Sequence, residues 1–168
     1  TVVVEQVQRA FNYYHAHIYL WDDARQNLVL AGGTGEAGQT LLARGHSIPQ
    51  GRGLVGRAAE FNRPVIVPDV SQQAGWLANP LLPETRAEIA VPIRRGDRVM
   101  GVLDVQQNQV NGLGQTDVDL LLSIAGQLGI ALENAALLKE REEALEGMRA
   151  EQVRLQNIFD NVTIPMLI

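Results

Sequence analysis

The spacing of apolar residues predicts a helix followed by a strand at the start of this chain. Apolar side chains recur at helical spacing at Val3, Val7, Ala10, Phe11 and Tyr14. We therefore expect an amphipathic helix over residues 1 to about 13. From His15 to Trp21 the period changes to two, with the histidine and aromatic side chains on one face and smaller apolar ones on the other. This pattern predicts a strand that is covered on both sides.

Short elements separated by turns fill the middle of the chain. We expect a turn over Asp22 to Gln26, strands at Leu28 to Ala31, His46 to Ile48 and Val65 to Val67, a glycine-rich loop at Gly32 to Gly38, and a short helix from Leu54 to Phe61. Pro64 ends that helix, because proline lacks the amide hydrogen that a helix needs. A long loop runs from Asp69 through Trp76 to Pro83.

A β-hairpin is predicted between Glu84 and Gln106. Two apolar runs flank Gly96-Asp97 there, and this dipeptide suits a tight turn. With a period of two, one face of the first strand carries Glu88, Ala90 and Pro92, and one face of the second carries Met100, Val102 and Asp104. Two carboxylates therefore lie on an otherwise apolar hairpin.

The last predicted element is a long helix with a narrow apolar seam. We expect it to begin at Thr116, with Asp119 completing a variant of the capping box. Its apolar residues form two stretches that are one residue out of register, namely Leu121, Ala125, Leu128, Leu132 and Ala135, then Leu145, Met148, Gln152, Leu155 and Phe159. The charged segment from Lys139 to Glu143 separates the stretches. Such seams predict a parallel homodimer formed by residues 1–13 and 116–160.

Composition excludes several classes of function. The 168 residues include no cysteine, so the chain has no disulfide framework, no thiolate nucleophile and no thiol to attach a chromophore. A net charge of -5 argues against nucleic acid as a partner, because neutralising phosphates needs clustered Lys and Arg. No apolar run approaches the ~20 residues that span a bilayer. We therefore expect no membrane insertion, and a cytoplasmic fragment of a longer protein.

The segment from Gly51 to Gly56 matches the dinucleotide-binding pattern GxGxxG letter for letter. That site needs a buried strand before the glycines and a long helix after them, whereas Pro49 precedes them and Pro64 ends the helix early. We interpret the glycines as a sharp turn into a short helix, whose N-terminus directs free amides towards whatever lies beneath.

Candidate ligand-binding side chains gather around the hairpin carboxylates. Carboxylates that face an apolar cavity favour a ligand with a cation or a hydrogen-bond donor, and the alternative is an exposed rim or a salt bridge to Arg86 or Arg98. Tyr19, Trp21 and Trp76 either stack on a planar ligand or belong to the core. The candidate ligand-binding residues are Glu88, Asp104, Tyr19, His17, Leu54, Asp69 and Trp76.

Three histidines are candidate metal ligands. His15 and His17 share a strand face and could meet His46, but no carboxylate or cysteine completes a familiar ligand set at a predictable spacing. We therefore expect these histidines to line a polar pocket or the surface. We expect no metal ligands and no catalytic residues in this chain.

Four segments in the same order resemble the GAF family of small-molecule sensor domains. They are Gly51 to Ala58, Arg63 to Val70, the Glu84 to Gln106 hairpin and Ile124 to Asn134, and the resemblance covers roughly residues 1–136. It implies an α+β fold with a six-stranded antiparallel sheet, the terminal helices on one face and a ligand pocket under loops on the other. The last residues resemble the entry of a PAS domain. The expected organisation is a GAF domain over 1–136, a coiled-coil signalling linker over 137–157 and a truncated PAS start over 158–168.

Three GAF subfamilies make predictions for individual residues. Bilin-binding domains use a cysteine or an Asp-Ile-Pro motif, and the nearest text here is Val67 to Val70. Cyclic-nucleotide-binding domains carry Asn-Lys, Phe and Asp-Glu, of which Asn108, Leu113 and Asp117 keep only the spacing. Free methionine-R-sulfoxide reductases have acidic residues that align with Glu88 and Asp104, but their chemistry needs thiolates. The resemblance leaves open a pocket for an amine or amino-acid-like ligand.

The resemblance implies a sensory module of a bacterial signalling protein of the sensor histidine kinase type, not an enzyme. Ligand binding would shift the sheet, and the terminal helices would transmit the shift to a downstream PAS or kinase output domain. The alternative is a structural dimerisation module with a degenerate pocket. A cavity of several hundred cubic ångströms lined by Glu88 and Asp104 would favour sensing, whereas a pocket filled by Trp76 or Tyr19 would favour the structural role. The sequence does not name the ligand.

Overall fold

A six-stranded antiparallel sheet in the order β3-β2-β1-β6-β5-β4 organises the first part of the computed structural model, which describes residues 2–161. The strands are β1 (His15–Trp21), β2 (Asn27–Gly33), β3 (Ser47–Pro49), β4 (Val65–Val67), β5 (Ala87–Arg95) and β6 (Arg98–Gln107). The helices are α1 (Val2–Phe11), α2 (Gly35–Ala43), α3 (Gly53–Phe61), the short 3-10 helix η1 (Val70–Gln72) and α4 (Gln115–Asn161). The chain divides into one compact unit that ends at Ile130 and a second that begins at Ala131.

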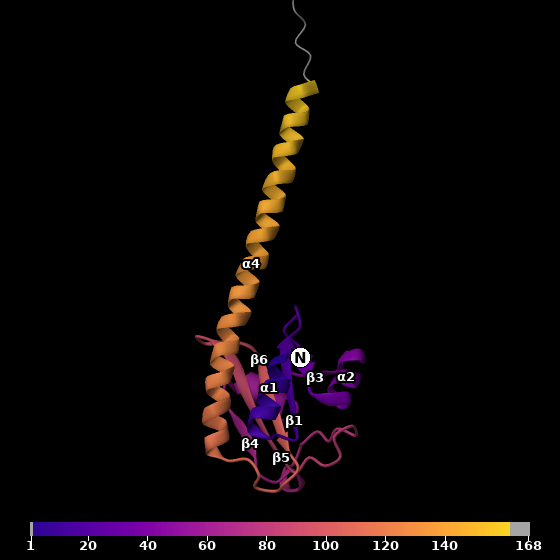
Figure 1. The fold of residues 1–168 in the computed structure, drawn as a ribbon, viewed down its shortest axis with the longest axis vertical. Coiled ribbons are helices and arrows are strands. Elements are labelled where there is room, and N and C mark those ends of the chain that lie inside the picture. The colour runs from indigo at the N-terminus through magenta and orange to yellow at the C-terminus, as the bar shows by residue number, and fades with distance from the viewer. Residues whose placement is uncertain (1, 162–168) are drawn as a thin grey trace, which may run out of the picture. The chain divides into compact units, whose positions relative to one another are not determined.

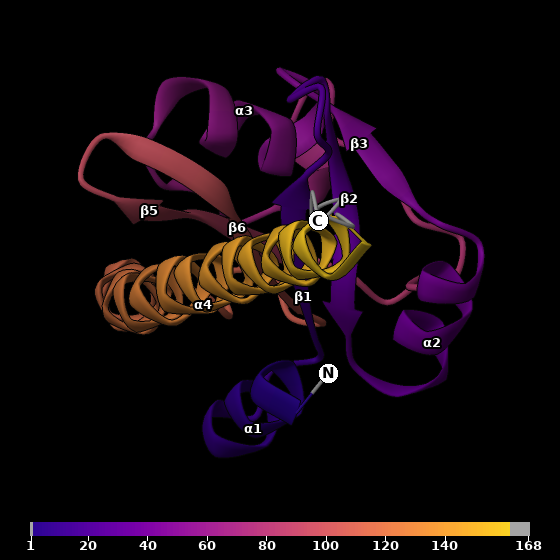
Figure 2. The same ribbon diagram turned by 90° about the horizontal axis from the view of Figure 1, so that it is seen from above.

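Helices cover both faces of the sheet (Figures 1 and 2). On one face lie α1 and the part of α4 up to Ile130, as the sequence predicted for the terminal helices. On the other face, α2 and α3 pack around Tyr19, Leu28, Leu30 and Val102. The α+β architecture and the number of strands are therefore confirmed.

The β5–β6 hairpin forms the centre of the sheet together with β1. Its turn lies at Gly96, whose φ of 57° is a left-handed value that glycine adopts without a side-chain clash. Ala90 pairs with Asp104, and Pro92 pairs with Val102, so the predicted shared faces of the two strands are correct. On the neighbouring strand, His17 pairs with Asp104.

A helix replaces part of the glycine-rich loop that the sequence predicted. The strand β2 extends to Gly33, and α2 begins two residues later. Gly38 brings α2 against the strand, because a Cβ atom there would lie 2.2 Å from the carbonyl carbon of Gly33. Glycine lowers helix propensity, so the residues that permit this close packing also hid the helix.

The long helix begins at Gln115, and its first turn is closed by Asp117. The Asp117 carboxylate accepts a hydrogen bond from the backbone N–H of Gly114 at 2.9 Å, while Asp119 accepts one from the Gln115 side chain. The predicted cap with Thr116 and Asp119 is therefore wrong. Gly114 holds the cap position, and the third residue after it is Asp117.

The beginning of the first apolar stretch of α4 packs inside the first unit. Leu121 and Ala125 are buried, and Gly129 lies so close to β5 that a Cβ atom there would be 2.3 Å from the Arg94 carbonyl oxygen. These positions are not available to a second copy of the chain, which corrects the prediction that they belong to a dimer seam.

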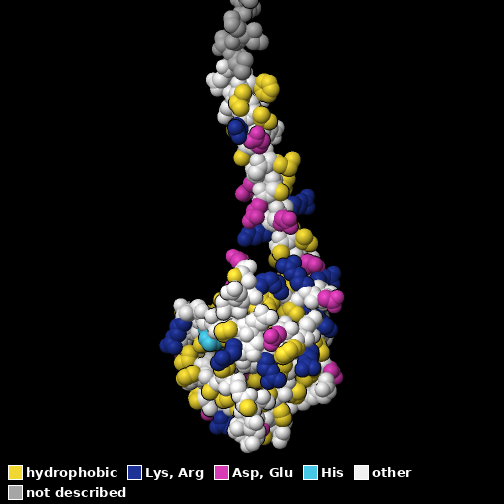
Figure 3. Space-filling model, turned by 180° about the vertical axis from the view of Figure 1, so that it is seen from behind, with side chains coloured by type: hydrophobic (Ala, Val, Ile, Leu, Met, Phe, Trp, Pro, Cys, Tyr) yellow, Lys and Arg dark blue, Asp and Glu magenta, His cyan; other side chains and the backbone are white. Residues whose placement is uncertain are grey.

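The second unit consists of the rest of α4 in the described residues. The helix continues without a break through Lys139 and Glu143, whose side chains form an ion pair of 3.9 Å. Exposed apolar side chains interrupt its charged surface (Figure 3), among them Leu138, Leu145, Met148, Leu155 and Phe159. Most of the predicted PAS start, residues 162–168, lies outside the described residues.

One window of α4 is more apolar than we expected when we predicted no membrane-spanning segment. It spans 18 residues with a mean hydropathy of 1.5, which meets the length and composition of a membrane-crossing segment. A helix that packs in the core of a soluble protein meets the same test. In this window 17% of the residues are buried, and Leu121 and Ala125 of α4 are buried in the first unit.

Candidate functional site

A cavity of about 400 Å³ lies between the sheet and the segments that cover its α3 face. Its floor comes from β1, β5 and β6, which contribute His17, Tyr19, Glu88, Asp104 and Gln106. Its walls come from the end of α2, from β3, from the start of α3 and from the loop over residues 77–81. The walls are largely apolar and include Leu41, Ile48, Leu54, Val55, Leu77 and Leu81. The cavity therefore combines apolar walls with a polar floor.

The two hairpin carboxylates lie in the floor of this cavity. Glu88 is 6% exposed and Asp104 is 1% exposed, so neither belongs to an exposed rim. Asp104 Oδ2 accepts hydrogen bonds from Gln106 Nε2 at 3.1 Å and from His17 Nδ1 at 3.3 Å. Asp104 Oδ1 has no hydrogen-bond partner among the described residues. The alternative of a salt bridge from either carboxylate to Arg86 or Arg98 is not observed in residues 2–161.

Burial changes the protonation of the two carboxylates. It raises the pKa of the Glu88 carboxyl well above the ordinary value of 4.5, and the charge of Asp104 raises it further. Burial also raises the pKa of Asp104, to about 6, although hydrogen bonds from Glu88 and Gln106 favour its charged form. At neutral pH these shifts favour a proton on Glu88 and a negative charge on Asp104.

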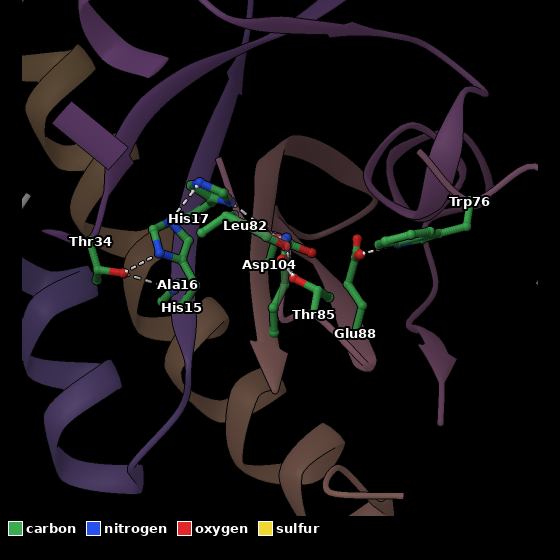
Figure 4. A network of polar contacts seen from close by, with 10 residues as sticks. His15, Ala16, His17, Thr34, Trp76, Leu82, Thr85, Glu88 and Asp104 are labelled. Carbon is green, nitrogen blue, oxygen red and sulfur yellow. Dashed lines mark hydrogen bonds and ion pairs between the residues drawn. The ribbon is translucent and has the colours of Figure 1, made fainter. Parts of the chain in front are cut away.

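A chain of hydrogen bonds continues from Asp104 through two histidines (Figure 4). The Nε2 atoms of His15 and His17 are 2.8 Å apart, and Thr34 Oγ1 lies 3.0 Å from His15 Nδ1. The backbone N–H of Ala16 can only donate, and it donates to Thr34 Oγ1. Burial lowers the pKa of both histidines to about 3, so both rings are neutral at physiological pH.

The negative charge of Asp104 determines which ring nitrogen carries the proton in His17 and in His15. An ionised Asp104 can only accept, so the proton on His17 must be on Nδ1. His17 Nε2 then accepts from His15 Nε2–H, and His15 Nδ1 accepts from the Thr34 hydroxyl. Each donor in this chain has one acceptor.

The sequence-predicted ligand-binding residues divide into three groups. His17, Tyr19, Leu54, Glu88 and Asp104 all line the cavity. Trp76 does not line it, but its indole N–H donates to Glu88 Oε2 at 2.7 Å.

Asp69 does not line the cavity. Its carboxylate accepts hydrogen bonds from the backbone N–H and the hydroxyl of Ser71, and so caps η1. This differs from the predicted role, because an acidic residue just before a short helix is used by the free amides of that helix.

Several polar residues of the site were not predicted from the sequence. Gln106 is buried beside Asp104, and its Oε1 accepts a hydrogen bond of 2.7 Å from the Thr85 hydroxyl. The alternation of side chains along the strand could have predicted Gln106, since it lies two residues after Asp104 on the same strand face. No sequence pattern predicts the role of Thr34, because it reaches His15 only through the pairing of β1 with β2.

The described residues 2–161 contain no group of three or more His, Asp or Glu side chains placed to hold a metal ion. His46 does not join the other two histidines as a third ligand. Its ring packs against Tyr19, with 6.1 Å between the ring centroids. The arrangement is instead a polar floor built for hydrogen bonding.

Comparison with known proteins identifies a family for this chain. The family model described as the GAF domain matches residues 1–133. The chain is also 31% identical to GAF domain-containing protein A of Dictyostelium discoideum over 122 residues, which cover 73% of this chain and 72% of that protein.

Solved structures share the fold. The GAF domain of the Acinetobacter phosphoenolpyruvate-protein phosphotransferase superposes with a TM-score of 0.70 at 24% identity, covering 83% of this chain and 82% of that one. The free methionine-R-sulfoxide reductase of Neisseria meningitidis, solved with its substrate, gives a TM-score of 0.68 at 29% identity and covers 79% of this chain and 74% of that one. A GAF domain of a larger protein and a free-standing enzyme are thus both among the similar structures.

Proposed function

We propose that this chain, which belongs to the GAF domain family, is a sensory module that binds a small ligand in the cavity above Glu88 and Asp104. It transmits the bound state through α4 to an output domain in a longer cytoplasmic signalling protein. A PAS or histidine kinase domain is the output that the predicted organisation favours. The module itself performs no catalysis.

The cavity is the observation that carries this proposal. Its volume of about 400 Å³ lies within the range of ~300–1,000 Å³ that is typical of small-molecule sites. Neither Tyr19 nor Trp76 fills it, since Tyr19 lies in the floor and Trp76 lies outside, bonded to Glu88. A purely structural module would gain stability from an apolar, filled core, whereas two buried carboxylates cost stability unless a partner compensates them.

The absence of cysteine supports a binding role over a reductase role. Some of the similar structures are free methionine-R-sulfoxide reductases. Reduction of a sulfoxide by a thiol mechanism needs a thiolate, and this chain has none. The carboxylates that align with theirs remain available to hold a ligand.

The exposed apolar side chains of α4 support a homodimer as the transmitting element. Leu138 lies seven residues before Leu145, and Met148, Leu155 and Phe159 continue the same heptad pattern. None of these side chains has an apolar partner in its own unit that buries it. A parallel pair of such helices transmits a shift at the sheet as rotation or sliding of one helix against its partner.

Native mass spectrometry of protein purified from its host tests this function. We expect a bound small molecule that fits the cavity and dissociates on denaturation. Adding it back at about 100 times its dissociation constant should raise stability by roughly 2.7 kcal/mol. If no molecule co-purifies and a broad screen of amino acids, amines, nucleotides and tetrapyrroles leaves the melting temperature unchanged, the structural dimerisation role is correct instead.

A further inference from the structure

We propose that His15 is a positioning residue of the site, which keeps His17 neutral by directing its Nε2–H at the Nε2 atom of the His17 ring. Because of this hydrogen bond, His17 does not become the cation that pairs with the Asp104 carboxylate. The inference deepens the proposed function of the cavity and rests on it, since it concerns the charge that the floor keeps. His15 itself does not line the cavity.

The backbone of β1 fixes the direction of the hydrogen-bond chain at the end that lies away from Asp104 (Figure 4). The backbone N–H of Ala16 can only donate, and Thr34 Oγ1 accepts it at 3.1 Å. Thr34 is 0% exposed, so its hydroxyl hydrogen also needs an acceptor inside the protein. In the described part of the chain this acceptor is His15 Nδ1, at 3.0 Å. His15 therefore carries its proton on Nε2.

The proton on His15 determines which hydrogen bonds His17 makes. The Nε2 atoms of the two rings are 2.8 Å apart, and a single hydrogen lies between them, so His15 donates and His17 accepts. The proton of His17 is then on Nδ1, which donates to Asp104 Oδ2 at 3.3 Å. This assignment begins at the Ala16 N–H and needs no assumption about the charge of Asp104. It agrees with the assignment that the charge of Asp104 gives.

Protonation of His17 would require the chain to reverse as far as Thr34. An imidazolium donates from both nitrogens, so His17 would donate from Nε2, and His15 Nε2 would have to accept. The proton of His15 would move to Nδ1 and point at Thr34 Oγ1, which already accepts the Ala16 N–H. The Thr34 hydroxyl hydrogen would then lose its acceptor, and a buried donor without an acceptor is costly. The chain therefore opposes a positive charge on His17.

A neutral His17 beside Asp104 needs such a reason. An opposite charge within ~4–6 Å favours the charged form of a histidine, and here the two side chains share a hydrogen bond of 3.3 Å. Burial, which penalises a charged ring, lowers the pKa of His17 to about 3, and His46 contributes in the same direction. The hydrogen bond from His15 adds to these effects.

The other charged or titratable groups near His17 do not take over this role. The ones that line the cavity with it are Tyr19, Arg44, His46, Glu88 and Asp104. A negative charge on either carboxylate would favour a charged His17 ring, whereas Arg44 would oppose it but is exposed to solvent. Among the described residues, His15 is the hydrogen-bond partner of His17 Nε2.

The variants His15→Gln and His15→Asn separate the hydrogen bond to His17 from the packing of His15. Glutamine is long enough to place an amide N–H near the position of the ring Nε2, whereas asparagine ends near the position of Nδ1. Nitrogen NMR of the imidazole rings as a function of pH measures the charged fraction of His17. We expect His17 to stay neutral at pH 5 in the wild type and in His15→Gln. In His15→Asn the charged fraction at pH 5 should be about tenfold larger or more, which corresponds to a pKa raised by at least about one unit.

Adding Asp104→Asn to His15→Asn provides the control for the ion pair. The protonated ring then has no carboxylate at position 104 to pair with, so the charged fraction should fall back towards the wild-type value. Equal charged fractions in His15→Asn and His15→Gln would overturn the proposal, because burial alone would then keep His17 neutral. The wild-type spectrum is decisive even if neither variant folds. A proton on Nδ1 of His15 would mean that the chain runs the other way, and the proposal would be wrong.

These measurements use the protein without a ligand, so their failure differs from failure of the proposed function. If His17 responds as expected and no molecule from the broad screen binds, the positioning role of His15 stands and the sensory function fails. If a molecule binds and the charge of His17 does not depend on residue 15, the sensory function stands and the positioning role is wrong.

Discussion

Replacing Asp104 with asparagine tests whether the structure holds this carboxylate in its charged form at a cost to folding. Asparagine keeps the shape of the side chain and cannot ionise. The replacement is best made in a Glu88→Gln background, because Glu88 and Asp104 influence each other's protonation. The comparison is then between two proteins that differ at one titrating group.

The magnitude follows from the pKa of Asp104. In the wild-type protein burial raises this pKa from 3.8 to about 6, and the hydrogen bond from Glu88, which lowers it, is absent from the Glu88→Gln background. One pKa unit is worth ~1.36 kcal/mol, so ionisation costs the folded state about 3 kcal/mol or more. Because the pKa is raised, the cost is absent below pH 3.8, grows as the pH rises and is complete above pH 6. Asp104→Asn should therefore become more stabilising, by roughly 2 to 3 kcal/mol, between about pH 4 and about pH 7.5.

Urea denaturation of both proteins at the two pH values measures this change. Effects of shape and of lost hydrogen bonds are present at both pH values, so they cancel in the difference between the two stability changes. Titration of His15 and His17 does not contribute, since burial lowers both pKa values to about 3, below the pH range compared. If the effect of Asp104→Asn is the same at both pH values within about 0.5 kcal/mol, the resolution expected from such extrapolations, Asp104 is not desolvated and the charge assignment of the site is wrong.

Three further predictions concern packing, assembly and the histidines. Gly129→Ala should destabilise the first unit by ~1–3 kcal/mol, because its Cβ would lie 2.3 Å from the Arg94 carbonyl oxygen. The matched Gly126→Ala on the same helix has no atom within 4 Å and should stabilise it by ~1 kcal/mol; equal effects in thermal unfolding would contradict the packing of α4. Ending the chain after residue 136 should weaken dimerisation, and light scattering that finds a monomer for the full chain at tens of micromolar would refute the dimer itself. Nitrogen NMR should show His17 neutral with its proton on Nδ1 at neutral pH, and a charged ring there would break the assigned chain of donors.

Local patterns in the sequence were enough to predict the hairpin and the side chains on each of its faces. Alternation between Glu88 and Pro92, and between Met100 and Asp104, depends only on the extended backbone, in which neighbouring residues point to opposite sides. For the same reason His17 and Tyr19 were placed on one face of β1. Glycine at position 96 marked the turn, since few other residues accept its backbone angles.

Patterns that depend on tertiary packing do not predict the structure correctly in this chain. The helix α2 was missed because its glycines serve a contact with β2 that the sequence does not reveal. The seam of Leu121 and Ala125 was assigned to a second copy of the chain, although the sheet of the same unit buries it. An apolar stripe on a helix indicates that another surface covers it, but it does not identify that surface.

The sequence alone therefore determined the paired carboxylates and the lack of cysteine, because each follows from residue identity and local spacing, and its resemblance to the GAF family implied the fold. Tertiary structure decided that Glu88 and Asp104 lie buried together at the floor of a cavity and that a chain of hydrogen bonds leads from Asp104 through His17 to Thr34. Those contacts join β1, β2, β5 and β6 across long stretches of chain. Their protonation depends on burial, which exists only after the strands have paired and the loops have closed over them.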